Sequence, residues 1–137
     1  MIEKQPVILY VEDDANSRKL MSMLLTRRMK LPHTTILENS ENFLEQMAAL
    51  DPKPDIIFLD IHLQPYNGFE MLKMLQQLDW MKGKPVIALT ASVMSEEVHQ
   101  LRTVGFNGCL AKPIDMNTFP EVVERILEGE TIWRILD

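Results

Sequence analysis

Residues 7–14 read VILYVEDD and residues 55–60 read DIIFLD, and these two stretches decide the fold class. Each is a short run rich in Val, Ile and Leu that ends in acidic residues. Runs of this kind, bounded by polar turns, are typical of strands buried on both faces of a parallel sheet. Because parallel strands end at the same edge of a sheet, we expect Glu12, Asp13 and Asp60 to converge. That edge is where open α/β sheets bind ligands.

The rest of the chain alternates between strand-like and helix-like segments. We predict strands at 6–12, 34–37, 55–60, 85–90 and 108–111, and helices at 15–30, 41–50, 68–79, 95–103 and 117–128. The last helix has the clearest i, i+3, i+4 pattern, which is formed by Phe119, Val122, Val123, Ile126 and Leu127. Right-handed crossovers place helices on both faces of the sheet. The expected fold class is therefore α/β, a doubly wound five-stranded parallel sheet.

Composition limits the range of functions. The chain has 137 residues, which fits one domain, and its net charge is -6 without any run of Lys and Arg. A nucleic-acid partner is therefore excluded and a protein partner is expected. The single cysteine, Cys109, cannot form a disulfide within the chain and fits a reducing compartment. We see no secretion signal and no stretch near the ~20 apolar residues of a membrane helix, so we expect a cytoplasmic protein without membrane contact.

The converging acids indicate a metal-assisted phosphoryl site. Clustered carboxylates repel one another unless a cation lies among them, and oxygen ligands of this kind suit Mg²⁺. Thr90 ends the run PVIALT, and Lys112 follows the run GCLA. Their hydroxyl and ammonium groups could each hold a phosphoryl oxygen. Each has a simpler alternative, a cap or turn residue for Thr90 and a solvated charge for Lys112. Asp14 is predicted to cap the first helix, and Asp55 is given no role.

From about residue 6 to residue 127 the sequence resembles the response-regulator receiver domains of two-component signalling. The matching stretches are VILYVEDDANSRKL, PDIIFLDIHLQPYNGFEML, PVIALTAS and GFNGCLAKPID. The resemblance implies a flavodoxin-like, CheY-like strand order of 2-1-3-4-5, with a stand-alone receiver domain at 1–129 and a short C-terminal extension at 130–137. It also implies roles for individual residues. Asp60 is the expected phosphoacceptor, and the expected Mg²⁺ ligands are Glu12, Asp13, Asp60 and the backbone carbonyl of His62. Thr90, Ala91 and Lys112 are the expected switch and phosphate-binding residues, and the bond before Pro113 is expected to be cis.

Three positions depart from the usual pattern of that family. Receivers usually carry a proline four residues after the phosphoacceptor, whereas this chain has Gln64 there and the proline one residue later. We therefore expect a different path for the loop that leads toward Gly68. His62 and Ser92 are candidates for tuning the reaction rate, although His62 could equally be a solvent-facing loop residue. Cys109 stands where most receivers have Tyr or Phe, and we favour a packed strand residue over a redox role. The apolar tail near Trp133 is expected to pack against the domain, or else to extend a partner or oligomer contact.

The expected function is that of a phosphoacceptor in a phosphorelay. The phosphoryl group would come from a histidine kinase or a histidine phosphotransfer protein, and water would later hydrolyse the aspartyl phosphate. The chain would signal as a monomer or weak homodimer through an unknown downstream protein target. That target is expected on the face formed by the fourth helix, fifth strand and fifth helix. We do not expect an enzyme beyond self-catalysed phosphotransfer and dephosphorylation.

Three alternatives compete with this interpretation. A haloacid-dehalogenase-type phosphatase would have a second aspartate where this chain has His62, and it usually adds a cap domain for which this length leaves no room. A phosphorylation-independent interaction module would not need the intact set of acids, threonine and lysine. A flavodoxin-like carrier needs phosphate donors after its first strand, where this chain has the acidic sequence EDDANS.

Overall fold

The computed structural model describes residues 5–91 and 94–134, and its centre is a parallel sheet with the strand order β2-β1-β3-β4-β5-β6. The strands are β1 (Ile8–Val11), β2 (Thr34–Leu37), β3 (Ile56–Asp60), β4 (Val86–Thr90), β5 (Gly108–Ala111) and β6 (Ile132–Arg134). The first five lie within the predicted ranges and in the expected order. The predicted α/β fold class is therefore confirmed.

The helices lie between these strands along the chain. They are α1 (Ala15–Ser22), η1 (Met23–Arg28), α2 (Phe43–Ala49), α3 (Gly68–Gln76), η2 (Asp79–Met81), α4 (Ser95–Val104) and α5 (Phe119–Leu127). The helix predicted at 15–30 continues from α1 into η1, which is π-helical. The helix predicted at 41–50 begins later because Asn42, with φ of 52°, has left-handed backbone geometry. Within the described part of the chain, no helix has the length and apolar character needed to cross a membrane.

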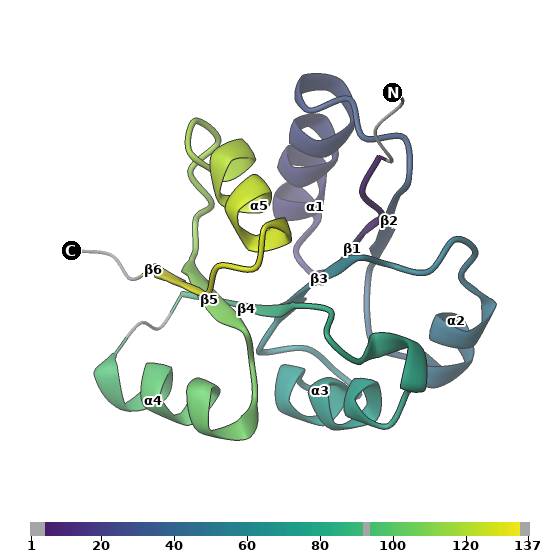
Figure 1. Cartoon of the computed structure of the whole chain (residues 1–137), viewed down its shortest axis with the longest axis vertical. Helices are drawn as coiled ribbons and strands as arrows, with labels where there is room; N and C mark the ends of the chain where they lie inside the picture. Colours follow the sequence, from purple (N-terminus) through teal and green to yellow (C-terminus); the bar gives the residue numbers. More distant parts are fainter. Residues whose placement is uncertain (1–4, 92–93, 135–137) are drawn as a thin grey trace.

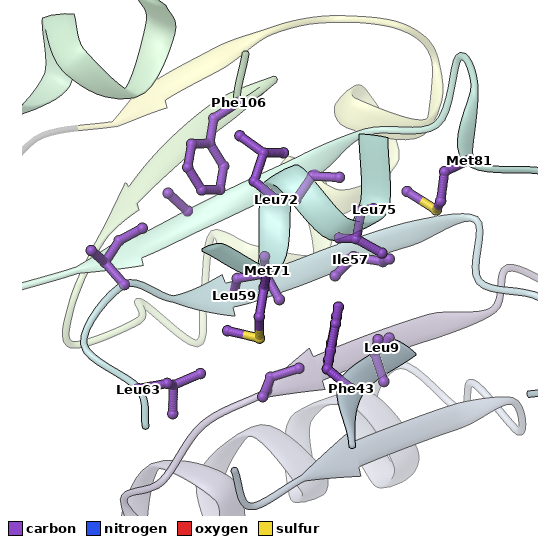
Figure 2. Packing of buried hydrophobic residues seen from close by; sticks show 14 of the residues in the cluster. Leu9, Phe43, Ile57, Leu59, Leu63, Met71, Leu72, Leu75, Met81 and Phe106 are labelled. Carbon is purple, nitrogen blue, oxygen red and sulfur yellow. The ribbon is translucent and has the colours of Figure 1, made fainter. Parts of the chain in front are cut away.

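Helices cover both faces of the sheet and enclose two apolar cores. Figure 1 shows α1 and α5 on one side of the sheet and α2, α3 and α4 on the other. The core under α2, α3 and α4, seen in Figure 2, contains Leu9, Phe43, Ile57, Leu59, Leu63, Met71, Leu72, Leu75, Met81 and Phe106. The core under α1 and α5 includes Ile8, Tyr10, Met21, Leu24, Phe58, Phe119, Val122 and Ile126. Alternate strand residues thus enter opposite cores, which places Tyr10 and Glu12 on the α1/α5 side.

The sheet has a sixth strand, so the prediction of five strands was wrong at this edge. β6 runs parallel to β5, with Ile132 opposite Gly108 and Trp133 opposite Cys109. Ile132 is buried in the core under α1 and α5, which gives the strand an apolar anchor. A side chain at Gly108 would meet the carbonyl oxygen of Ile132 at 2.6 Å, so only glycine permits this approach. Within the predicted extension, Ile132–Arg134 therefore continue the sheet along the outer edge of β5 (Figure 1).

Candidate functional site

Two neighbouring strands bring three carboxylates together at the carboxyl edge of the sheet. Glu12 and Asp13 follow β1, and Asp60 is the last residue of β3, which pairs in register with β1. One carboxylate oxygen from each residue lies within 4.8 Å of the others. Glu12 and Asp60 are buried, while Asp13 is exposed. The cluster could bind a metal ion, and Asp13 marks its solvent-facing side.

Lys112 joins the two buried acids. Its Nζ lies 2.6 Å from Oε1 of Glu12 and 3.0 Å from Oδ2 of Asp60, and its side chain is 21% exposed. Burial lowers the pKa of Lys112, but the contacts with Glu12 and Asp60 outweigh burial and raise the pKa overall. Lys112 is therefore a cation at neutral pH. One positive charge thus faces two buried acids, and a third acid lies beside them.

The two buried acids differ in their affinity for protons. Burial, followed by the neighbouring Asp60, raises the pKa of Glu12 to about 7. Burial also acts to raise the pKa of Asp60, but hydrogen bonds with Glu12, the His62 N–H and Lys112 lower it overall. Without metal, Glu12 therefore takes up a proton as the pH falls below about 7, whereas Asp60 stays ionised. A bound cation would favour release of that proton, because metal ligands must be deprotonated.

Further donors fix Glu12 in place. The Tyr10 hydroxyl donates to Oε1 of Glu12 at 2.9 Å, and the Asp14 N–H donates to Oε2 at 3.3 Å. Burial, followed by the charge on Glu12, raises the pKa of Tyr10, so its hydroxyl stays protonated and acts as a donor. The Arg18 guanidinium donates to the backbone carbonyls of Glu12 at 3.1 Å and Asp13 at 2.7 Å. The turn after β1 is therefore held from both its side-chain and its backbone atoms.

Asp14 belongs to the first helix rather than to the acidic cluster. Its side chain accepts a hydrogen bond from the Ser17 N–H at 2.8 Å, which makes Asp14 the N-cap of α1. The predicted capping role of Asp14 is thus confirmed. Asp55 lies at the opposite end of β3, where its side chain accepts from the Val7 N–H at 2.8 Å.

The loop after β3 turns tightly around Asp60. The His62 N–H donates to Oδ1 of Asp60 at 2.9 Å, while the His62 side chain is exposed. Gly68, the first residue of α3, donates its N–H to the Ile61 carbonyl at 3.0 Å. A Cβ at Gly68 would lie 2.9 Å from the Ile61 Cα, so glycine is required for this approach. The Gln64–Pro65 bond, where the proline is displaced from its usual position, is cis.

Thr90 lies on the strand that pairs with the strand of Asp60. Thr90 is the buried last residue of β4, and it lies one position beyond Leu89, the register partner of Asp60. Its carbonyl accepts a hydrogen bond from the Lys112 N–H at 2.9 Å. Ala91 is exposed, and the Lys112–Pro113 bond is cis. Ser92, the second rate-tuning candidate, lies outside the described residues.

Cys109 is separate from the acidic cluster. It is fully buried in the core that α3 and α4 cover, opposite Trp133 of β6. Burial, followed by the charge on Glu97, raises the pKa of the thiol to about 11, so the thiol is protonated at neutral pH. The Arg102 guanidinium of α4 lies 4.6 Å from the centre of the Trp133 ring. An aromatic ring is thus present beside position 109, but it comes from β6.

Sequence reasoning missed Tyr10, Arg18 and the contact of Trp133 with α4. A signal for Tyr10 did exist. It carries a hydroxyl in an otherwise aliphatic strand, two residues before Glu12, so the two side chains share one face. Arg18 lies on the first turn of α1, where a long cation can reach back to the preceding carbonyls. Nothing in the sequence indicated that Trp133 would lie in a strand, because three residues are too few for a periodic pattern.

Fold and site together define a flavodoxin-like α/β domain with a lysine-paired acidic cluster at the carboxyl edge of its sheet. The family model for the response regulator receiver domain matches residues 8–124, and the chain belongs to this family. Receiver domains are the phosphoacceptor signalling domains of two-component systems. The resemblance inferred from the four sequence stretches is thereby confirmed.

Known proteins agree with this assignment. The chain is 31% identical over 121 residues to the polar-differentiation response regulator DivK of Brucella anthropi, which covers 88% of this chain and 94% of DivK. The chemotaxis protein CheY4 of Vibrio cholerae has a similar structure, with a TM-score of 0.78 at 22% identity over 90% of this chain and 99% of CheY4. The receiver domain of the sensor histidine kinase PA1611 from Pseudomonas aeruginosa also has a TM-score of 0.78, at 20% identity over 92% of this chain and 100% of that domain. That structure has a magnesium ion coordinated in the active site cleft.

Proposed function

We propose that Asp60 is the phosphoacceptor of this receiver domain. One observation carries the proposal: Asp60 is a buried, ionised strand-end carboxylate that lies beside two further acids and within 3.0 Å of the Lys112 ammonium. Burial removes water that would compete with an incoming phosphoryl group, and the lysine provides a positive charge for its oxygens. No other acid in the described part of the chain combines these features.

The same acids fit Mg²⁺. Glu12, Asp13 and Asp60 provide carboxylate oxygens within 4.8 Å of one another, and hard oxygen donors are what Mg²⁺ prefers. The magnesium ion in the PA1611 receiver domain supports the same assignment here. We assign the His62 carbonyl as a further ligand, because the His62 N–H already holds Oδ1 of Asp60 and fixes the adjacent backbone. When bound, Mg²⁺ would neutralise charge on the transferring phosphoryl group.

Each residue of the site has its own role in phosphotransfer. A carboxylate oxygen of Asp60 forms a bond to phosphorus as the phosphorus–nitrogen bond of a phosphohistidine breaks, and the imidazole leaves. The donor is a histidine kinase or a histidine phosphotransfer protein. Lys112 moves its contact from the Asp60 carboxylate to a phosphoryl oxygen, and the Thr90 hydroxyl binds another. The exposed His62 side chain, two residues after Asp60, is the candidate for tuning how fast water hydrolyses the aspartyl phosphate. Beyond these self-catalysed steps we assign no enzyme activity, and we place the protein in the cytoplasm with its partners.

The downstream protein target would bind a face that differs from the predicted one by the strand β6. Because β6 lies along the outer edge of β5, the exposed surface on this side is formed by α4, β6 and α5 rather than by α4, β5 and α5. The Trp133 ring and Arg102 connect β6 with α4 in this surface. A movement of α4 after phosphorylation would therefore also change the surroundings of Trp133, and a partner bound to this face would contact both.

Intact-mass spectrometry tests the phosphoacceptor assignment. Wild-type protein incubated with Mg²⁺ and phosphoramidate, a small donor with a phosphorus–nitrogen bond, should gain the mass of one phosphoryl group. Asp60→Asn should gain none, while the matched control Asp55→Asn, at the opposite end of the same strand, should be labelled like the wild type. Equal labelling of Asp60→Asn would refute the assignment.

A further inference from the structure

Glu12 is held by donors on both of its carboxylate oxygens, and their distribution is uneven. Oε1 accepts from the Tyr10 hydroxyl at 2.9 Å and contacts the Lys112 ammonium at 2.6 Å. Oε2 accepts only a long bond from the Asp14 N–H at 3.3 Å among the contacts described for it. A carboxylate oxygen has two lone pairs, so the two short contacts on Oε1 engage both of its lone pairs, whereas the long bond from Asp14 engages Oε2 only weakly. Oε2 is therefore the oxygen that Glu12 can more readily offer to a metal ion.

During phosphotransfer Lys112 is proposed to move, whereas the Tyr10 hydroxyl keeps its position. Lys112 lies between Glu12 and Asp60, and in the proposed function it moves toward the phosphoryl group. Tyr10 is 1% exposed and packed in the core under α1 and α5, so its hydroxyl has a fixed position. After Lys112 has moved, the Tyr10 hydroxyl is still bonded to Oε1. The orientation of Glu12 is therefore maintained by a group that takes no part in the transfer.

We propose that Tyr10 is a positioning residue for the metal site, whose hydroxyl holds Oε1 of Glu12 so that Oε2 faces the cation. This inference rests on the proposed function and extends it to a residue that does not touch the metal or the phosphoryl group. Outer-sphere partners of this kind typically change metal affinity by about 10- to 100-fold when removed. Tyr10→Phe removes only the hydroxyl, so we expect Mg²⁺ to bind about tenfold more weakly.

The main alternative is a purely structural role, in which Glu12 merely satisfies a buried hydroxyl. The two roles predict different measurements. A structural role would lower the stability of the metal-free protein without changing its affinity for Mg²⁺. A positioning role weakens Mg²⁺ binding whatever happens to the stability without metal. The affinity for Mg²⁺, measured apart from phosphorylation, therefore separates the two.

The experiment is a Mg²⁺ titration of the full chain followed by NMR of the backbone amides near Asp60, with urea unfolding in EDTA measured in parallel. Tyr10→Phe and Tyr10→Leu both lack the hydroxyl, and Tyr66→Phe is the matched control. Tyr66 is exposed, and its backbone N–H and carbonyl are hydrogen-bonded to the Ser40 hydroxyl. We expect about tenfold weaker binding for both Tyr10 variants and an unchanged dissociation constant for Tyr66→Phe.

Unchanged Mg²⁺ affinity in a folded Tyr10 variant would overturn the inference and leave the proposed function intact. Weakening of equal size in Tyr66→Phe would also overturn it, because the effect would then not depend on contact with Glu12. Absence of Mg²⁺ binding by the wild-type protein would instead refute the proposed function, and this inference with it.

Discussion

Replacing Lys112 by methionine tests whether its ammonium group compensates the buried acids. Methionine keeps much of the apolar stem but removes the charge that lies 2.6 Å from Glu12 and 3.0 Å from Asp60. Breaking a buried ion pair typically costs about 3 to 5 kcal/mol. The cost should be smaller here, because Lys112 is partly exposed and Glu12 can take up a proton. We expect about 2 to 3 kcal/mol at pH 8 without metal, and less than about 1 kcal/mol at pH 5.5.

Thermal unfolding in EDTA and in Mg²⁺ measures this effect. An unfolding entropy of about 2.1 cal/mol/K per residue over 137 residues corresponds to roughly 3.5 °C per kcal/mol. Lys112→Met should therefore melt about 7 to 10 °C below the wild type at pH 8 in EDTA. Mg²⁺ should raise the melting temperature of the variant more than that of the wild type, because the ammonium no longer repels the metal ion.

Lys82→Met is the matched control for this experiment. The Lys82 ammonium lies 3.8 Å from Asp79, but both side chains are more than four-fifths exposed. Removing this pair should change stability by less than about 0.5 kcal/mol. If Lys112→Met were as stable as the wild type in EDTA at pH 8, the ammonium would not compensate the buried acids. Weaker stabilisation of the variant than of the wild type by Mg²⁺ would show the same.

Three further predictions follow from the site. The pKa of Glu12 is raised from 4.5 to about 7, so between pH 4.5 and pH 7 the native state binds more protons than the unfolded state. Urea unfolding in EDTA should therefore show stability falling as the pH rises from 4.5 to 7. A flat or rising profile would contradict the raised pKa. Gly68→Ala should lower both stability and phosphorylation rate, because its Cβ would lie 2.9 Å from the Ile61 Cα; unchanged urea unfolding and labelling kinetics would show that the loop adapts freely. Beryllofluoride, a phosphoryl mimic, should change hydrogen exchange in the segment after Thr90. Thr90→Ala should remove most of that response, whereas Cys109→Ala should remove little of it. The reverse pattern would assign the switch to Cys109.

Much of the fold and site could be predicted because both depend on short-range patterns. Strands β1 and β3 end in acids, and parallel pairing alone brings the ends of such strands together. The position of Lys112 followed from the same rule. Helix ends were less accurate where backbone geometry intervened, as at the left-handed Asn42 before α2.

The features that sequence analysis missed depend on contacts across the sheet. β6 is only three residues long, and its place beside β5 depends on Gly108 having no side chain. The hydrogen bond from Tyr10 depends on how far a buried hydroxyl reaches along one face of β1. Similarly, the ring beside Cys109 comes from Trp133, which is distant in sequence. None of these contacts follows from the local periodicity of the segments that make them.

Locating the modified residue shows directly whether Asp60 accepts the phosphoryl group and whether the reaction depends on Mg²⁺. Protein treated with acetyl phosphate is reduced with borohydride, which converts an aspartyl phosphate into homoserine, and the peptides are sequenced by mass spectrometry. We expect homoserine at position 60 when Mg²⁺ is present and unmodified Asp60 when EDTA replaces it. Homoserine at position 13 or 14 with Asp60 unmodified would assign the phosphoacceptor to another acid, and equal conversion of Asp60 in EDTA would show that the reaction does not need Mg²⁺.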